Sequence, residues 1–152
     1  MTRLLGVDLG DKRIGLALAD PGMDPPHPLA TVPRAATVEG DATMLRAVIE
    51  RQGIGEVILG LPLDFHGAEG AQATKTRAWG ESMAAILGLP VLLRDERLSS
   101  DRAAREIGPM KRGRSGGPPT SAQRRAYRER LDREAAAIIL RDELDARAGR
   151  DL

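Results

Sequence analysis

Three acidic residues lie where they could act together on a phosphodiester bond. Asp8 closes the apolar run 3–9, and Glu96 lies near the end of the apolar run 90–98. Asp132 shares a helical stripe with Ala136 and Ile139, so its carboxylate points toward a packing face. Carboxylates are the ligands that Mg²⁺ and Mn²⁺ prefer, and such ions activate water for phosphodiester cleavage. The pattern predicts catalysis by these three acids on Mg²⁺ or Mn²⁺.

Each acid also has a simpler interpretation, which the residues alone leave open. Asp8 could cap the turn that follows it. Glu96 could pair with Arg94 or Arg97, and Asp132 could be an exposed partner of Arg128, four residues earlier on a helix.

Basic residues gather in one part of the chain. Between Lys111 and Glu134 there are eight Lys or Arg and three Asp or Glu, a charge of +5 in a chain whose net charge is +1. Such a cluster is typical of a protein that binds a phosphate backbone, although a solvated helix face has the same composition. The candidate substrate-binding residues are Arg13, Arg97, Lys111, Arg112 and Arg114.

The first part of the chain predicts three antiparallel strands. Residues 3–9 and 13–19 form a hairpin around Gly10-Asp11-Lys12, and residues 29–33 add a third strand after a turn rich in Pro. The strand 13–19 alternates bulky residues with Gly15, Ala17 and Ala19, and this small face would let a helix sit close.

The rest of the chain alternates helices with strands. We expect a helix over 41–52 with Asp41 as its cap, a second over 71–87, and a third through Ile107 after a cap at Ser99 or Ser100. Buried strands are expected over 56–62 and 90–98. A mobile basic loop over about 108–121 leads to a C-terminal helix over about 121–148. These elements predict one α/β domain over 1–152, a five-stranded mixed sheet of three antiparallel and then two parallel strands, flanked by helices.

Composition narrows the classes of function. Aromatic residues make up 2% of the chain, so base stacking on an aromatic platform is not expected. The chain has no Cys, which excludes thiolate zinc sites. It has only two His, which argues against a His-rich metal site. No apolar run is long enough to span a bilayer, and no secretory signal is present, which predicts a cytoplasmic protein without a membrane partner.

Four blocks along the chain resemble the YqgF/RuvX family. They are GVDLGDKRIGLA (6–17), VILGLPLDFHGAEG (57–70), PVLLRDERLSS (90–100) and LDREAAAIIL (131–140), in the order and spacing of that family. The resemblance implies an RNase H-like fold related to the Holliday junction resolvase RuvC, with catalytic acids at Asp8, Glu96 and Asp132. It implies either maturation of pre-16S rRNA at its 5′ end or cleavage of four-way DNA junctions in recombination. Ser99 and Ser100 stand where the family more often has two Thr.

Two other classes of function remain open in the sequence. The Asp-Leu-Gly hairpin also resembles the phosphate-binding segment of actin-type ATPases, but those enzymes close two such domains around a nucleotide. A non-catalytic RNA-binding factor for ribosome assembly would need only the basic segment. A junction-cutting enzyme would act as a homodimer with two active sites, whereas an RNA-trimming enzyme on ribosomal precursor particles could be a monomer.

Overall fold

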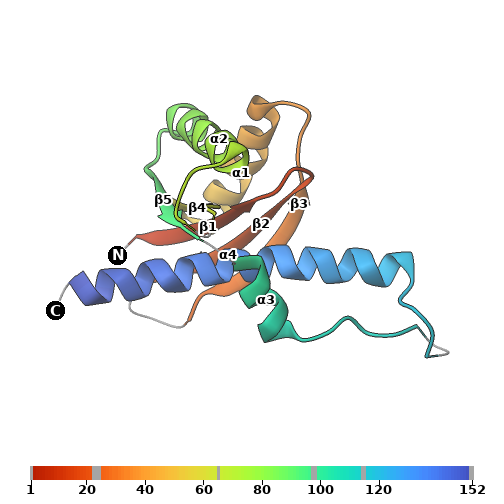
Figure 1. The fold of residues 1–152 in the computed structure, drawn as a ribbon. Coiled ribbons are helices and arrows are strands. Elements are labelled where there is room, and N and C mark those ends of the chain that lie inside the picture. The colour runs from red at the N-terminus through yellow and green to blue at the C-terminus, as the bar shows by residue number, and fades with distance from the viewer. Residues whose placement is uncertain (1, 22–24, 65, 97–98, 114–115, 151–152) are drawn as a thin grey trace.

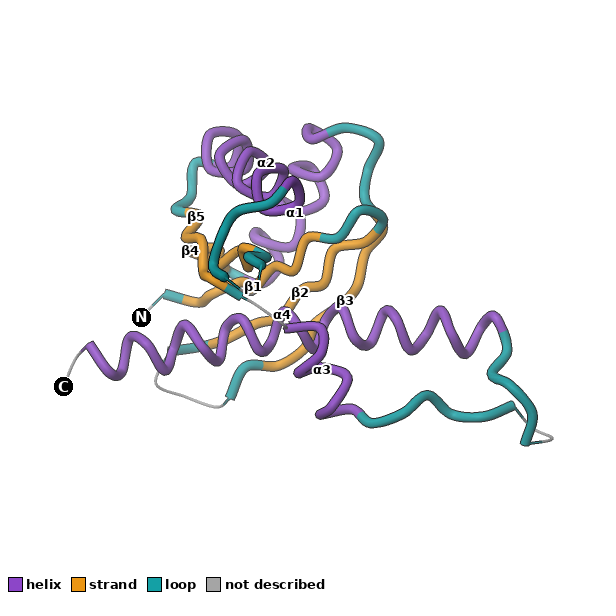
Figure 2. The backbone as a smooth tube through the Cα atoms, viewed as in Figure 1, coloured by secondary structure: helices purple, strands orange, loops and turns teal. Residues whose placement is uncertain are grey.

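The computed structural model describes residues 2–21, 25–64, 66–96, 99–113 and 116–150. Figures 1 and 2 show a sheet with helices on both of its faces. The strands are β1 (Arg3–Leu9), β2 (Arg13–Ala19), β3 (His27–Pro33), β4 (Ile54–Leu61) and β5 (Val91–Asp95). The helices are α1 (Val38–Gln52), α2 (Ala71–Leu87), α3 (Ser99–Ile107) and α4 (Ser121–Arg150).

The sheet has the strand order β3-β2-β1-β4-β5. β1 pairs with β2 and β2 with β3 in antiparallel fashion, whereas β1–β4 and β4–β5 are parallel. The predicted mixed sheet of three antiparallel and two parallel strands is confirmed. β3 forms one edge and has a proline near each end, Pro28 and Pro33.

Strict alternation along the strands divides the core between the two faces of the sheet. Side chains such as Leu5, Val7 and Leu59 pack against α1 and α2, together with the buried Trp79. Their sequence neighbours Leu4 and Ile58 face the other way and pack against α4. Strands buried on both faces read as continuous apolar runs, which is why β1 and β4 were recognisable in the sequence.

Glycines on three adjacent strands allow α4 to lie directly on the sheet. A Cβ atom on Gly15 of β2 would come within 2.0 Å of the Asp132 carbonyl oxygen, and one on Gly6 of β1 within 2.7 Å of the Ala136 carbonyl oxygen. On Gly60 of β4 it would come within 2.4 Å of Ile139 Cδ1. The close helix expected over the small face of 13–19 is therefore confirmed.

The start of α1 differs from the prediction. Thr37, not Asp41, caps this helix, because its hydroxyl accepts a hydrogen bond from Gly40 N at 3.0 Å. Asp41 is completely buried, and its carboxylate accepts hydrogen bonds from Arg34 Nε, Ala35 N and Trp79 Nε1. The helix thus begins at Val38, one turn before the first expected helical residue.

The other bounds lie close to those expected. β3 begins two residues earlier than predicted, β4 is Ile54–Leu61, and α2 matches. α3 ends at Ile107 as predicted but already includes Ser99, which was expected as a cap, and α4 extends to Arg150. β5 ends at Asp95, and residues 97 and 98 of the expected strand lie outside the described residues. Among the helices that the structure describes, none is long and apolar enough to cross a membrane.

Candidate active site

Asp8 points to the face of the sheet that α4 covers. Asp8 pairs with Gly15 across the β1–β2 ladder, and residues opposite each other in a ladder project to the same face. Gly15 is also the residue over which the Asp132 backbone of α4 lies. The missing side chain at Gly15 therefore brings the helix that carries Asp132 down beside Asp8.

Asp132 is held by an arginine from β2. Arg13 has the same parity as Gly15, so it projects toward α4, and its Nε lies 2.6 Å from Asp132 Oδ2. Both side chains are partly exposed. The alternative partner, Arg128, makes no ion pair within the described residues. Arg13, predicted to contact substrate phosphate, is thus a neighbour of a candidate metal ligand.

Glu96 follows β5 directly and is 5% exposed. Its backbone N–H donates to Leu61 O at 3.0 Å, which continues the β4–β5 pairing by one residue. Its Oε1 lies 3.5 Å from Arg94 Nε and its Oε2 3.8 Å from Arg102 Nη1. The predicted alternative of a pairing with Arg94 is therefore present in the structure.

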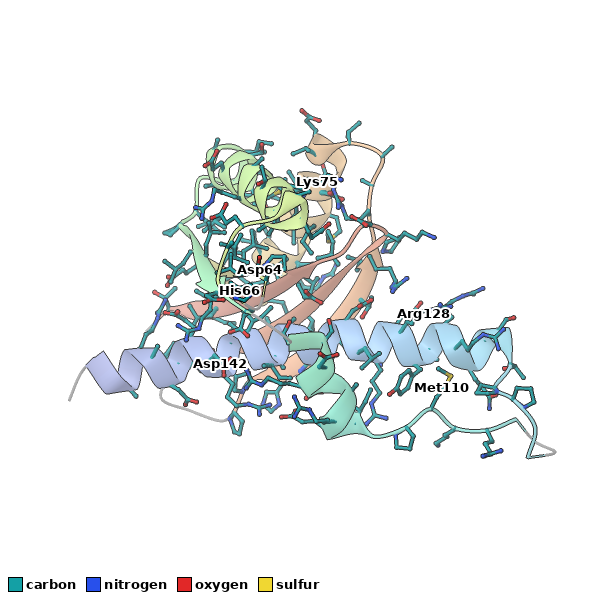
Figure 3. All side chains as sticks on the ribbon, viewed as in Figure 1. Asp64, His66, Lys75, Met110, Arg128 and Asp142 are labelled. Carbon is teal, nitrogen blue, oxygen red and sulfur yellow. The ribbon has the colours of Figure 1, made fainter. Side chains whose placement is uncertain are left out.

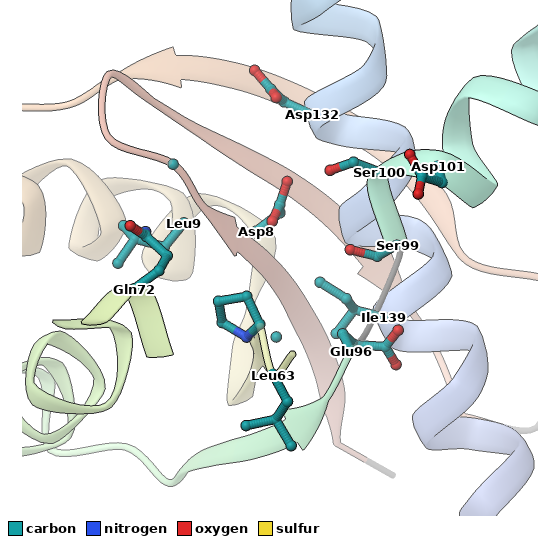
Figure 4. Close-up of a pocket in the computed structure, with 13 residues that line it drawn as sticks. Asp8, Leu9, Leu63, Gln72, Glu96, Ser99, Ser100, Asp101, Asp132 and Ile139 are labelled. Atoms are coloured by element: carbon teal, nitrogen blue, oxygen red, sulfur yellow. The ribbon is translucent and has the colours of Figure 1, made fainter. Parts of the chain in front are cut away.

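One cavity of about 330 Å³ is walled by all three acids. It opens at the carboxyl ends of β1 and β4, the edge where ligands bind in open α/β sheets. In Figure 4, Asp8 lies between Asp132 and Glu96, and the carboxylate of Glu96 is turned away from Asp8. Leu9 and Gln72 lie on one side of Asp8, and Ser99 and Ile139 on the other. Tertiary packing therefore gathers the predicted acids around one space.

Asp8 is a partly buried carboxyl that no described residue neutralises. No hydrogen bond or ion pair to its side chain is found among the described residues. Burial, and secondly the negative charge of Asp132, raise the pKa of Asp8 to about 7. A nearby cation would remove this cost, because an opposite charge favours the ionised form.

Glu96 belongs to a second group of charges beneath the cavity. Burial, followed by a hydrogen bond to Asp142 and the charge of Asp142, raises the pKa of Glu96 to about 8. Arg102 of α3 spans both carboxyls, with its Nη1 2.6 Å and its Nη2 3.1 Å from the two oxygens of Asp142. Arg102 and Asp142 thus fix the direction in which Glu96 points.

The donor set suits a hard divalent cation, although the side chains do not close around one. Glu96 Oε1 is buried without a hydrogen-bond partner, and Asp8 is uncompensated, so both could accept a cation. Within the described residues, however, no group of three or more His, Cys, Asp or Glu is close enough to hold one ion together. Glu96 would have to turn from Arg94, and Asp132 from Arg13. Metal binding by Asp8, Glu96 and Asp132 stays a prediction.

Two of the predicted loop cations lie apart from this cavity. Lys111 and Arg112 belong to the loop after α3, and neither lines the space between the acids. Arg112 donates to Gly116 O at 3.2 Å, within the loop. Arg97 and Arg114 lie outside the described residues.

Some residues of the site were not singled out from the sequence. Ser99, Ser100 and Asp101, at the start of α3, line the acid cavity with Gln72 of α2. Ser99 was noted only as a possible helix cap, and nothing in the local pattern connects Gln72 with Asp8. Asp142 lies ten residues after Asp132 on α4 and could have been suspected only as an acid among apolar residues.

Known proteins resemble this chain over nearly all its length. A family model described as "RuvX: Holliday junction resolvase" matches residues 2–146. A protein of Anaeromyxobacter sp. (strain Fw109-5), named "Putative pre-16S rRNA nuclease", is 42% identical over 95% of this chain and 98% of its own. One of the same name from Paramagnetospirillum magneticum is 38% identical over 97% of this chain and 88% of its own.

A solved structure shares the fold. RuvC of T. thermophilus, in complex with a Holliday junction substrate, superposes with a TM-score of 0.56 at 16% sequence identity. The superposition covers 97% of this chain and 96% of that one. The expected RNase H-like α/β fold is thereby confirmed.

Proposed function

The chain belongs to the RuvX family, and on that premise we propose that it is a metal-dependent endonuclease acting on structured nucleic acid. Its reaction is hydrolysis of a phosphodiester bond. Its most direct substrate is pre-16S rRNA, the molecule for which its relatives are named, and we infer that it acts at the 5′ end of that precursor. A cytoplasmic location, where ribosomal precursors are found, is part of this proposal.

One observation carries the proposal. Asp8, Glu96 and Asp132 come from a strand, a strand end and a helix far apart in sequence, and all three wall the same cavity. Gathering carboxylates at one cavity is costly, and among the described residues Asp8 has no cation partner, so a fold that does this needs a reason. Cation binding for phosphodiester hydrolysis supplies that reason.

Each residue has a distinct part in this proposal. Asp8, Glu96 and Asp132 would hold Mg²⁺ or Mn²⁺, which supplies activation of water and neutralises charge on the phosphate when bound. Arg13 lies beside Asp132 and can donate two parallel hydrogen bonds to a phosphate. Ser99, Ser100 and Gln72 offer neutral donors along the cavity wall. The apolar side chains of Leu9 and Ile139 limit the access of bulk water.

A four-way DNA junction is the second candidate substrate, since the matching family model carries that description. Cleavage of two strands of a junction would need two active sites and hence a homodimer. RNA trimming places no such demand on the assembly.

The test compares two substrates under matched conditions. Purified protein and its Asp8→Asn variant are incubated with a 5′-extended 16S precursor fragment or a synthetic four-way DNA junction, with Mn²⁺, Mg²⁺ or EDTA. Denaturing gels report cleavage, and binding is measured in EDTA.

Metal-dependent cutting that disappears in Asp8→Asn would support the nuclease, and the better substrate would decide between the two roles. Binding without cutting under any of these conditions would contradict it. The chain would then be better described as an RNA-binding assembly factor.

A further inference from the structure

A second cavity lies between the loop that follows α3 and the N-terminal part of α4. Its volume is about 320 Å³. Figure 3 shows Met110 on this loop, which passes close to α4, and Arg128 on the other side of the helix. The lining includes Met110, Tyr127, Lys111, Arg130 and Arg133. None of these residues lines the acid cavity.

Two hydrogen bonds hold the walls of this cavity in place. The Tyr127 hydroxyl donates to Gly108 O at 2.7 Å, and Gln123 Nε2 donates to Arg112 O at 3.1 Å. Each bond joins α4 to the loop. The cavity is therefore formed before any ligand enters, which lowers the entropic cost of binding.

The charge of the cavity is unbalanced. Three cations line it, Lys111, Arg130 and Arg133, and no Asp or Glu does so among the described residues. None of the three makes an ion pair or hydrogen bond within the part of the chain that the structure describes. Residues 107–128 contain six Lys or Arg and no acid at all. Arg130 feels the charge of Glu134, four residues further along α4, but no short ion pair among the described residues occupies any of the three cations, so they remain available to an anion.

The cavity lies across α4 from the catalytic acids. Gln123, on its wall, precedes Asp132 by nine residues, which on a helix of 3.6 residues per turn places the two on opposite sides. Figure 1 shows the N-terminal part of α4 running past β3, beyond the edge of the sheet. A flexible strand leaving the acid cavity could therefore cross this projecting helix.

We propose that the cavity binds one unpaired nucleotide of the nucleic-acid substrate. The phosphate would lie against Arg130 and Arg133, and the base against Met110 and the ring of Tyr127. Its volume is at the small end of the usual range for ligand sites, ~300–1,000 Å³, which suits one nucleotide and not a duplex. The inference rests on the proposed nuclease function and adds a place for the strand on the side of α4 opposite the acid cavity.

Recognition at this subsite would be independent of base identity. The Tyr127 hydroxyl and the Gln123 amide are already engaged with the loop and with Thr120. The contacts left for a base are apolar ones, which every base can make. The subsite would thus select for an unpaired strand and not for a sequence.

The test uses two substrates that differ only in the unpaired flank. One is a precursor stem with its single-stranded extension, and the other is the same stem with a blunt end. Binding is measured in EDTA, where no cleavage occurs, with Arg130→Ala/Arg133→Ala and wild type. The matched control is Arg125→Ala/Arg128→Ala, which removes the same charge from α4 on the side that carries Asp132.

We expect the cavity variant to bind the flanked stem about tenfold more weakly at moderate salt, with a much smaller change for the blunt stem. The control variant should weaken both substrates by similar factors. Equal losses on both substrates in the cavity variant, or a flank-dependent loss in the control, would overturn the subsite. The melting temperature of each variant shows whether it is folded.

Two further arms separate other outcomes. A mononucleotide or inorganic phosphate that stabilises wild type but not the cavity variant, and displaces no flanked stem, would assign the cavity to a free small anion and overturn the proposal. Cleavage by the wild type is scored separately with Asp8→Asn. Loss of the nuclease proposal therefore appears as absent cleavage, whereas loss of the subsite appears as absent flank discrimination.

Discussion

The carboxyl of Asp8 is desolvated and lies near the negative charge of Asp132, and no described residue pairs with it as a cation. Its pKa is raised from 3.8 to about 7. Between these pH values the folded protein holds a proton that the unfolded chain has released, so the contribution of this group to stability falls as the pH rises. Ionisation of Asp8 thus lowers the stability of the fold, and a bound cation would offset this loss.

A first prediction follows for metal binding. Mn²⁺ should raise the melting temperature of the wild type more at about pH 8 than at about pH 5.5, because at the lower pH protons compete with the ion for Asp8. Asp8→Asn should melt higher than wild type without metal at the higher pH and show a smaller Mn²⁺ shift. Thermal unfolding at both pH values measures this, and equal shifts in both proteins would argue against a shared metal site.

Arg13 and a cation should compete for Asp132. Arg13 Nε lies 2.6 Å from Asp132 Oδ2, which leaves this carboxylate less available to a metal. We expect Arg13→Ala to need less Mn²⁺ for half of its thermal shift, and to bind substrate about tenfold more weakly if Arg13 neutralises one phosphate. Titration of Mn²⁺ and of substrate in separate experiments gives both numbers. An unchanged Mn²⁺ requirement would show that the ion pair does not limit metal binding.

At the scale of elements, the site depends on how closely α4 approaches the sheet. Gly15 pairs with Asp8 in the β1–β2 ladder, and the Asp132 backbone of α4 packs directly against Gly15. Any side chain at this position would push the helix away and separate the two acids.

Gly15→Ala should therefore destabilise the protein and impair the site. A Cβ atom 2.0 Å from Asp132 O forces a backbone shift, and overpacking of this kind costs about 1–3 kcal/mol. At ~2–4 °C per kcal/mol, the melting temperature should fall by several degrees. Gly149→Ala on α4 is the control, because a Cβ atom there meets nothing within 4 Å. Similar losses of melting temperature in both variants would contradict the claim that Gly15 is needed for the close approach of α4.

Helix α3 should act on Glu96 through Arg102. This side chain pairs with Asp142 of α4 and lies 3.8 Å from Glu96. In Arg102→Ala the two carboxyls lose their shared cation, so the variant should lose more stability at high pH, where both are ionised, than at about pH 6. If metal-dependent cleavage occurs, its rate should fall with little change in the affinity for substrate. A pH-independent loss of stability would contradict this role.

The elements themselves were largely predictable, because long apolar runs and helical spacing are local signals. The small face of β2 even indicated where a helix would lie. The start of α1 was placed too late because the interpretation began at the first apolar repeat and took Asp41, rather than Thr37, as the cap. Asp41 instead serves the tertiary bond to Trp79, 38 residues away in sequence.

The sequence indicated which acids form the site, but not which side chains pair with them or how the acids point. The Arg13–Asp132 pair joins residues 119 positions apart, so no spacing rule could have suggested it. The turn of Glu96 toward Arg94 depends on where α3 and α4 meet. The basic loop was recognised by its charge, whereas its closure into a cavity depends on Tyr127 and Gln123, whose bonds to the loop are visible only in three dimensions.

At the scale of the whole molecule, the acid cavity and the basic segment 107–128 lie apart. The acid cavity lies at the sheet edge, and the acid-free segment 107–128 extends away from it along α4. When Lys and Arg bind phosphates, the nucleic acid releases its own counterions. Substrate affinity should therefore fall steeply as ionic strength rises.

The salt dependence can be assigned to this segment. For Arg125→Ala/Arg128→Ala, the slope of log affinity against log salt concentration should become shallower by ~0.7–0.9 for each phosphate that is no longer neutralised. Arg51→Ala, at the far end of α1, serves as a control that should leave the slope unchanged. A slope unaltered by both variants would mean that the projecting helix does not touch the backbone.

The prolines of β3 have a consequence for self-association. An exposed sheet edge can recruit a strand from another molecule and so begin aggregation, but a proline has no N–H to offer such a strand. Pro28 and Pro33 limit what β3 presents, and α4 crosses the same strand where Thr31 donates to Glu129 O. Intermolecular strand addition is therefore directed to the opposite edge, β5, where exposed Leu92 stands beside the charged Arg94 and Asp95.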